Sequence, residues 1–98
     1  MTKWQINFHP AALAEAEAAR NWYAQRNPFA ARAFVTELQG ALRSIVDSPK
    51  RWPSFTENTR RYVFPRFPFS LIYRLSDSTI QVIAIAHAGR KPDYWQDR

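Results

Sequence analysis

Apolar and polar residues alternate at the start of the chain. The apolar side chains are Trp4, Ile6 and Phe8, and the polar ones beside them are Lys3, Gln5 and Asn7. A period of two residues predicts a short β-strand with one buried face. Pro10 suits the first position of a helix, and residues 11–25 are rich in Ala, Glu and Arg, which favours a helix there.

A second helical pattern follows Asn27, which suits a helix cap, and Pro28, which suits a first helical turn. Its apolar residues recur at helical spacing and are Phe34, Leu38, Ala41, Leu42 and Ile45. Its polar residues, expected mostly on the other side, are Arg32, Glu37, Gln39 and Arg43. The helix is expected to end at 47–49, and the short link between the two helices predicts an antiparallel helical hairpin.

The rest of the chain predicts a loop and then three strands. Residues 49–60 are expected to form the loop, with Trp52 as its anchor against the core. Strands are predicted over 60–64, 69–75 and 79–86. Short connections favour an antiparallel meander, and the last strand is expected inside the sheet because it is apolar on both faces.

The predicted order is therefore β-α-α-β-β-β. The expected fold class is α+β, with the helical hairpin on one face of the sheet. With 98 residues, the chain is expected to form a single domain over 1–98.

Composition narrows the classes of function. The chain has 14 Lys and Arg against 8 Asp and Glu, a net charge of +6, which favours an acidic partner. The absence of Cys excludes disulfides and a Cys nucleophile and suits a reducing cytoplasm. His9 and His87 have no metal-binding spacing with the carboxylates, so no metal site is expected. We also expect no signal peptide, no membrane span and no membrane partner, because no apolar run is long enough.

The end of the chain carries the residue types suited to chemistry. The apolar strand predicted over 79–86 runs directly into His87, Arg90, Lys91, Tyr94 and Trp95. Such side chains can bind phosphate, stack on a base or move a proton. The simpler alternative is structural: His87 at a strand end packs or hydrogen-bonds, and Tyr94 and Trp95 cover the sheet edge or the helical hairpin.

The sequence resembles the RelE/ParE superfamily, the bacterial toxins of type II toxin–antitoxin systems, which includes plasmid stabilisation proteins. The likeness covers essentially the whole chain and is carried by residues 8–12 with 22–23, by Pro49 with 60–63 and 67–74, and by 83–95. It implies the same order of elements, growth inhibition in the cytoplasm, no cofactor, and an antitoxin as partner.

Two activities occur within that superfamily, and the shared fold does not choose between them. The ParE-like branch inhibits DNA gyrase, and the RelE-like branch cuts messenger RNA on the ribosome as a metal-independent endoribonuclease. The closing His-x-x-Arg-x-Pro-x-Tyr-Trp is more similar to the ParE-like members, so gyrase inhibition is the leading expectation. A third alternative is a non-toxic module that binds its antitoxin for autoregulation.

The nuclease alternative assigns definite roles to residues. Cleavage by the RNA's own 2′-hydroxyl needs a base, an acid and cations at the scissile phosphate. His87 is the candidate base or acid, Arg61 and Arg74 the phosphate ligands, and Tyr94 a stacking or proton-transferring group. The sequence departs from the strongly nucleolytic pattern, because Glu57 is the only carboxylate within residues 50–64.

The binding alternative assigns the basic and aromatic residues to contacts with the antitoxin or the target. These residues are Arg60, Arg61, Arg74, Arg90, Lys91 and Trp95. In an antiparallel sheet, arginines on an open face meet solvent or a partner, and an acidic antitoxin segment is the partner that the net charge favours.

Overall fold

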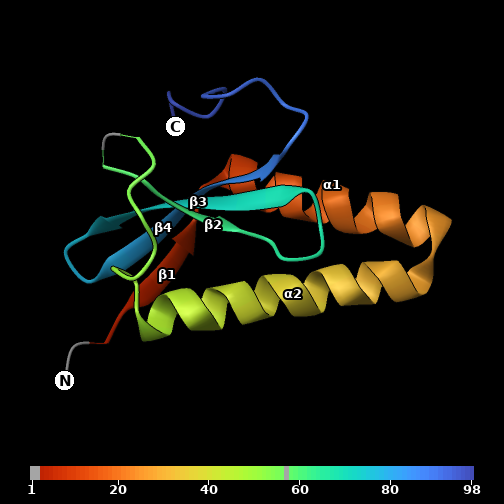
Figure 1. Cartoon of the computed structure of the whole chain (residues 1–98), viewed down its shortest axis with the longest axis horizontal. Coiled ribbons are helices and arrows are strands. Elements are labelled where there is room, and N and C mark those ends of the chain that lie inside the picture. The colour runs from red at the N-terminus through yellow and green to blue at the C-terminus, as the bar shows by residue number, and fades with distance from the viewer. Residues whose placement is uncertain (1–2, 57) are drawn as a thin grey trace.

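A computed structural model describes residues 3–56 and 58–98; Glu57 lies outside the described residues. Its elements follow the predicted order (Figure 1). They are β1 (Gln5–Phe8), α1 (Pro10–Arg26), α2 (Pro28–Asp47), β2 (Arg60–Val63), β3 (Phe69–Ser76) and β4 (Thr79–His87). The α+β class, the helical hairpin and the three closing strands are confirmed.

The four strands form one sheet in the order β1-β4-β3-β2. Strands β2, β3 and β4 are antiparallel neighbours, so the predicted meander is confirmed. Strand β4 lies between β1 and β3, as its two apolar faces indicated. Strand β1 pairs with β4 in parallel from Gln5↔Thr79 to Phe8↔Val82, a pairing the sequence pattern had left open. The long connection through the hairpin permits it, because a parallel pair needs a crossover.

Local side-chain bonds fix both helix starts. The imidazole Nδ1 of His9 accepts a hydrogen bond from the Ala11 amide at 3.1 Å, and Pro10 opens α1. Asn27 closes α1 and caps α2, its side-chain oxygen accepting from the Phe29 amide at 2.9 Å. These caps satisfy amides that a helix start leaves without partners, which is why the two helices begin where the sequence predicted.

The main core lies between the hairpin and one face of the sheet. Phe34 of α2 is fully buried there among Phe64, Phe67 and Phe69, and the indole of Trp52 packs against this core as predicted. A second, smaller core on the other face is formed by Ile72, Ile83, Ala84 and Trp95.

The second core explains why β4 is apolar on both sides. The β3–β4 register shifts between Ile72 and Tyr73, where Ile72 pairs with Ala84 but Tyr73 pairs with Val82. The extra residue, Ile83, joins Ala84 in the second core. A bulge of this kind inserts one residue and re-aims its neighbours. Figure 1 shows the C-terminal tail, residues 88–98, on the side of the sheet away from α2. Its Trp95 packs in the second core and so covers this face.

One sequence-based expectation about α2 is wrong. Glu37, expected on the outward side, is only 9% exposed. Its carboxylate accepts from the Arg66 amide at 2.9 Å and from Arg66 Nε at 2.9 Å. The β2–β3 connection reaches over α2 at this point, and a helical pattern cannot foresee a carboxylate that is covered by a distant loop.

Candidate functional site

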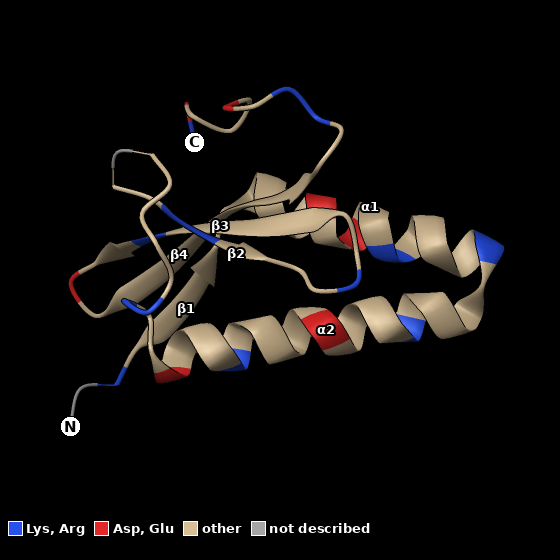
Figure 2. Ribbon diagram, viewed as in Figure 1, with Lys and Arg blue, Asp and Glu red and all other residues tan. Residues whose placement is uncertain are grey.

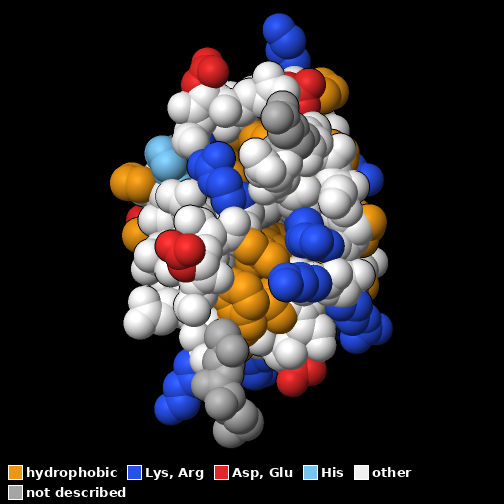
Figure 3. All heavy atoms as spheres, turned by 90° about the vertical axis from the view of Figure 1, so that its left-hand side faces the viewer, with side chains coloured by type: hydrophobic (Ala, Val, Ile, Leu, Met, Phe, Trp, Pro, Cys, Tyr) orange, Lys and Arg blue, Asp and Glu red, His pale blue; other side chains and the backbone are white. Residues whose placement is uncertain are grey.

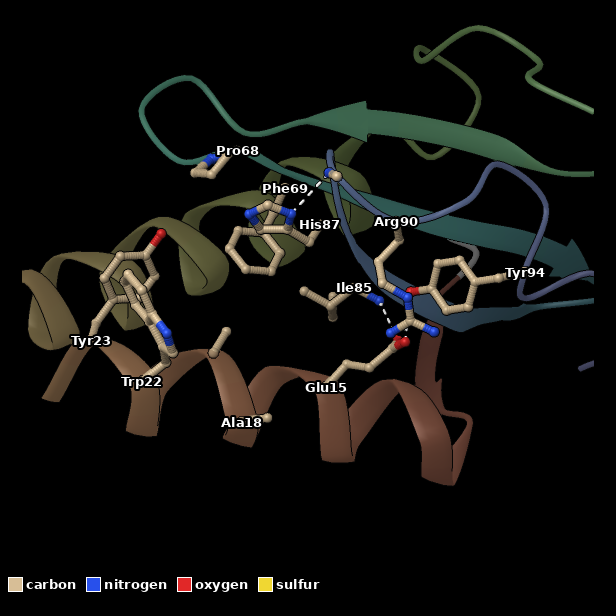
Figure 4. Close-up of a pocket in the computed structure, with 12 residues that line it drawn as sticks. Glu15, Ala18, Trp22, Tyr23, Pro68, Phe69, Ile85, His87, Arg90 and Tyr94 are labelled. Atoms are coloured by element: carbon tan, nitrogen blue, oxygen red, sulfur yellow. Dashed lines mark hydrogen bonds between the residues drawn. The ribbon is translucent and has the colours of Figure 1, made fainter. Parts of the chain in front are cut away.

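A groove of about 610 Å³ runs between α1, the ends of β3 and β4, and the beginning of the tail (Figure 4). Small and aromatic residues of α1 form one wall, and the strand ends form the other. Its lining residues are Glu15, Ala18, Ala19, Trp22, Tyr23, Pro68, Phe69, Ile85, His87, Gly89, Arg90 and Tyr94. The groove thus has mostly apolar and aromatic walls, with Glu15, His87 and Arg90 among its polar groups, a composition suited to binding.

Glu15 contacts several other residues at one end of this groove. Its carboxylate accepts from the Tyr94 hydroxyl at 2.6 Å and forms an ion pair with Arg98 at 2.8 Å. It also accepts from the Ile85 amide at 3.0 Å, while Arg98 donates to the Ile83 carbonyl at 3.1 Å. Strand β1 stops pairing with β4 at Val82. Beyond that point, Glu15 and Arg98 form hydrogen bonds with the backbone of β4 that a longer β1 would otherwise form.

Tyr94 is held in its neutral form by this network. Burial raises the pKa of Tyr94 most, and its hydrogen bond to the Glu15 carboxylate raises that pKa further. Arg90 lies over the Tyr94 ring at 3.9 Å. A phenol with a raised pKa, already donating to a carboxylate, is poorly placed to exchange a proton with a substrate near neutral pH.

His87 ends β4 and faces the groove. Its Nδ1 accepts from the Gly89 amide at 2.8 Å, and its ring meets the Phe69 ring edge-on at 5.1 Å. A backbone amide is always a donor, so neutral His87 carries its proton on Nε2 in this conformation. Nε2 is then a donor toward the groove and cannot act there as a base.

The turn after His87 depends on a glycine. A Cβ at position 89 would lie 3.1 Å from His87 Nδ1, closer than ordinary van der Waals contact. Gly89 therefore lets the backbone approach the imidazole closely enough to donate its hydrogen bond.

The arginines of β2 and β3 lie outside the groove, and each contacts another part of the chain. Arg60 donates to the Lys50 and Trp52 carbonyls at 3.0 and 2.6 Å and so ties the loop to β2. Arg61 lies over the Phe55 ring at 4.2 Å. Arg74 donates to the Gln81 side chain at 3.1 Å and to the Arg98 carbonyl at 3.0 Å.

The sheet separates these arginines from the imidazole. Directly paired residues of neighbouring strands project to the same face. His87 pairs with Phe69, which packs in the main core, whereas Arg61 pairs with Ile72, which packs in the second core. Arg74 alternates with Ile72 along β3 and therefore shares its face with Arg61. The structure brings His87 and Tyr94 to the same groove but places Arg61 and Arg74 on the other face of the sheet, so it does not gather all four residues of the nuclease alternative.

The tail residues divide into buried and open ones. Trp95 is 4% exposed and packs on the sheet face rather than at its edge, so direct contact with a partner would require the tail to move. Arg90 and Lys91 are exposed. Their binding roles stay predictions.

Sequence reasoning missed Glu15, Arg98 and Trp22. Glu15 lies in an Ala-rich helix, where a carboxylate ordinarily meets solvent, and its three partners come from β4 and the tail. The indole of Trp22 lines the groove and is 51% exposed. Trp22 stands beside Tyr23 on a helix rich in Ala, and this pair of large aromatic residues was the signal that could have singled it out.

Within residues 3–56 and 58–98, no cluster of three or more His, Cys, Asp or Glu side chains is arranged to hold a metal ion. The same part of the chain contains no helix both long and apolar enough to cross a membrane.

Comparisons with known proteins give a family model, a relative and a solved structure of the same fold. The chain matches the model of the family described as "ParE toxin of type II toxin-antitoxin system, parDE" over residues 6–92. It is 30% identical over 79 residues to Toxin RelE2 of Caulobacter vibrioides, a match that covers 81% of this chain and 89% of that protein. A chain of the solved structure "Chromosomal ParDE TA system from P. aeruginosa" superposes with a TM-score of 0.77 at 20% identity, over 89% of this chain and 98% of that chain. The chain belongs to the ParE toxin family, within the RelE/ParE superfamily of type II toxin–antitoxin toxins.

Proposed function

We propose that this protein inhibits DNA gyrase in the cytoplasm and is neutralised by a separate antitoxin. Membership of the ParE toxin family supports the toxin and antitoxin parts of this proposal. The observation that favours gyrase inhibition over RNA cleavage is the separation of His87 from Arg61 and Arg74 by the sheet.

The separation is too large for one scissile phosphate. His87 pairs with Phe69 at one end of the β3–β4 ladder, and Arg74 pairs with Gln81 nearer its other end. The two positions are five residues apart along β3, or roughly 17 Å at about 3.3 Å per residue. An acid or base must lie within hydrogen-bond reach of the proton that it moves. A phosphate held by Arg74 would therefore lie out of reach of His87.

The groove is our proposed antitoxin site. Ala18, Ala19 and Ile85 offer it apolar walls, and Arg90 adds a cation at the rim. An acidic and hydrophobic segment would bury these walls and pair with Arg90 and the neighbouring Lys91. Arg60, Arg61, Arg74 and Trp95 would act as supports of the fold, because each already contacts other parts of the chain.

Pulse labelling of DNA, RNA and protein synthesis after induction of this chain alone tests the proposal. We expect DNA synthesis to stop first, and co-expression of the small reading frame beside the gene to restore growth. If protein synthesis stops first, the RNA-cleaving alternative replaces gyrase inhibition. Unchanged growth at good expression would select the non-toxic module.

A variant sharpens the choice of target. His87→Ala should leave inhibition of supercoiling by purified gyrase within about threefold of wild type. Inhibition by binding needs no acid or base, so it does not depend on the imidazole of His87. A ribosome-dependent nuclease would instead lose transcript cleavage in this variant while keeping its fold, as checked by circular dichroism.

A further inference from the structure

The outer end of the helical hairpin carries exposed aromatic side chains beside arginines. Trp22 is 51% exposed and Phe29 is 71% exposed. The guanidinium of Arg26 lies 3.7 Å from the centre of the Trp22 ring, and that of Arg32 lies 4.9 Å from the centre of the Phe29 ring. We call these four residues the hairpin tip.

The charged residues at this end of the hairpin are all basic. Between Glu17 and Glu37 the charged residues are Arg20, Arg26 and Arg32. Figure 2 shows basic residues at the outer end of the hairpin, with the acidic residues of the helices nearer the sheet. Glu37 is itself paired with Arg66. The tip therefore complements an acidic surface.

The tip is organised before any partner arrives. Arg26 donates to the Trp22 carbonyl at 3.0 Å, which holds its guanidinium over the indole. A guanidinium stacked by its face keeps donors along its edge for carboxylates. Trp and Arg are also the residues that most often dominate the binding energy of protein interfaces. Because Arg26 is already held over the indole, it loses less conformational freedom on binding than a free arginine would.

We propose that the hairpin tip docks an acidic and apolar surface of the target protein. This inference rests on the proposed function, because it assumes a protein target. Two isolated arginine–aromatic pairs make a small apolar patch, whereas nucleic acid binding favours a continuous basic track along a groove.

Trp22 gives the proposal a consequence for neutralisation. Its indole belongs to the tip and also lines the groove assigned to the antitoxin (Figure 4). An antitoxin segment in the groove would cover Trp22 and so remove part of the target's docking surface. Neutralisation would then follow from overlap of two surfaces, without any change in the fold.

The test compares substitutions at opposite ends of the molecule. Arg32→Glu and Phe29→Ala change the tip without touching the groove. Arg51→Glu is the matched control, because Arg51 lies over the Trp52 ring at 5.2 Å. Figure 3 shows that end of the molecule, where Lys and Arg side chains lie beside an apolar patch. Each variant is assayed for growth inhibition, for gyrase inhibition and for antitoxin affinity, with thermal melting as a check on folding.

We expect the two tip variants to lose at least tenfold in growth inhibition while antitoxin affinity stays within threefold and Arg51→Glu behaves as wild type. Tip variants as toxic as wild type would overturn the inference. The inference would also be overturned if the tip variants lost antitoxin affinity and kept their toxicity. Binding of an oligonucleotide to wild type but not to Arg32→Glu would overturn it as well.

The two proposals fail differently. If wild-type protein leaves purified gyrase unaffected but the tip variants still lose toxicity, gyrase is the wrong target and the tip inference stands. If wild type inhibits gyrase and the tip variants inhibit it equally, gyrase is the target and the tip inference is wrong.

Discussion

At the scale of residues, the Glu15 carboxylate joins parts of the chain that are far apart in the sequence. Its partners Tyr94, Arg98 and the Ile85 amide belong to the tail and to β4. Both side chains of the ion pair are largely buried, with Arg98 18% exposed and Glu15 16% exposed. Removal of one charge leaves the other covered without its partner.

Glu15→Gln should therefore lower the free energy of unfolding by about 3 kcal/mol, a value typical of a broken buried pair. Urea denaturation measures the change. Glu17→Gln is the matched control, because Glu17 is exposed on the same helix and its loss should cost less than about 0.5 kcal/mol. Equal stabilities of the two variants would contradict the role assigned to Glu15.

Tyr94 predicts a dependence of stability on alkaline pH. Its folded-state pKa is raised above the ordinary 10.0 by burial and by Glu15. The folded state therefore keeps a proton that the unfolded state releases, so this stabilisation is complete below about pH 10 and is lost as pH rises above it.

Urea denaturation at about pH 8 and about pH 11 checks this prediction. Between these two pH values, wild type should lose more stability than Tyr94→Phe, which retains the ring but cannot ionise. Tyr23 and Tyr73 also have raised pKa values and remain in both proteins, so the difference isolates Tyr94. Parallel losses in the two proteins would show that Tyr94 ionises equally in the folded and unfolded states.

Sequence patterns placed the helix caps correctly because the partners of a cap are local. Asn27 and Pro28 were predicted at a helix start because a cap needs only the next few amides. Glu37 was placed on the wrong side, and Glu15 was not noticed, because each carboxylate is covered by a segment distant in the sequence. The candidate site residues His87 and Arg74 were likewise identified without the information that they lie on opposite faces.

At the scale of elements, the tail acts as a cover for the second face of the sheet. Trp95 lies against Ile72, Ile83 and Ala84, which would otherwise meet water. The tail has no regular helix or strand, so it is attached by side chains: Trp95 in the second core, and Tyr94 and Arg98 through their bonds to Glu15. The sequence pattern indicated that β4 is covered on both faces but could not say which segment covers the second one.

Trp95→Ala should cost about 3 to 5 kcal/mol of stability, the range for a large aromatic removed from a core. Hydrogen exchange should then show faster exchange of the tail amides before those of β3 and β4. Lys91→Ala, an exposed change in the same tail, should leave both measurements near wild type. Unchanged exchange in Trp95→Ala would mean that other contacts hold the tail.

At the scale of the whole molecule, the net charge of +6 acts through its field. Basic residues lie at both ends of the long axis, at the hairpin tip and beside the patch in Figure 3. Such a distribution attracts an acidic partner from several directions. Salt weakens this attraction, because at 0.1 M charges more than about 10 Å apart are largely screened from each other.

Association with an acidic antitoxin should therefore slow about tenfold or more between low and high salt, with a much smaller change in the dissociation rate. Stopped-flow mixing measures both rates. Charge reversal at Arg43, an exposed arginine outside the proposed surfaces, should reduce the association rate only slightly. An association rate that does not respond to salt would exclude electrostatic steering.

The parallel pairing of β1 with β4 has a consequence for how the protein is made. β1 is the first element of the chain, and its partner β4 is the last of the six. At ordinary rates of translation, β1 waits several seconds for that partner to leave the ribosome. During this time the sheet lacks its central strand, so any activity that needs the folded sheet cannot begin. The toxin therefore cannot reach its folded form before its last strand has been synthesised.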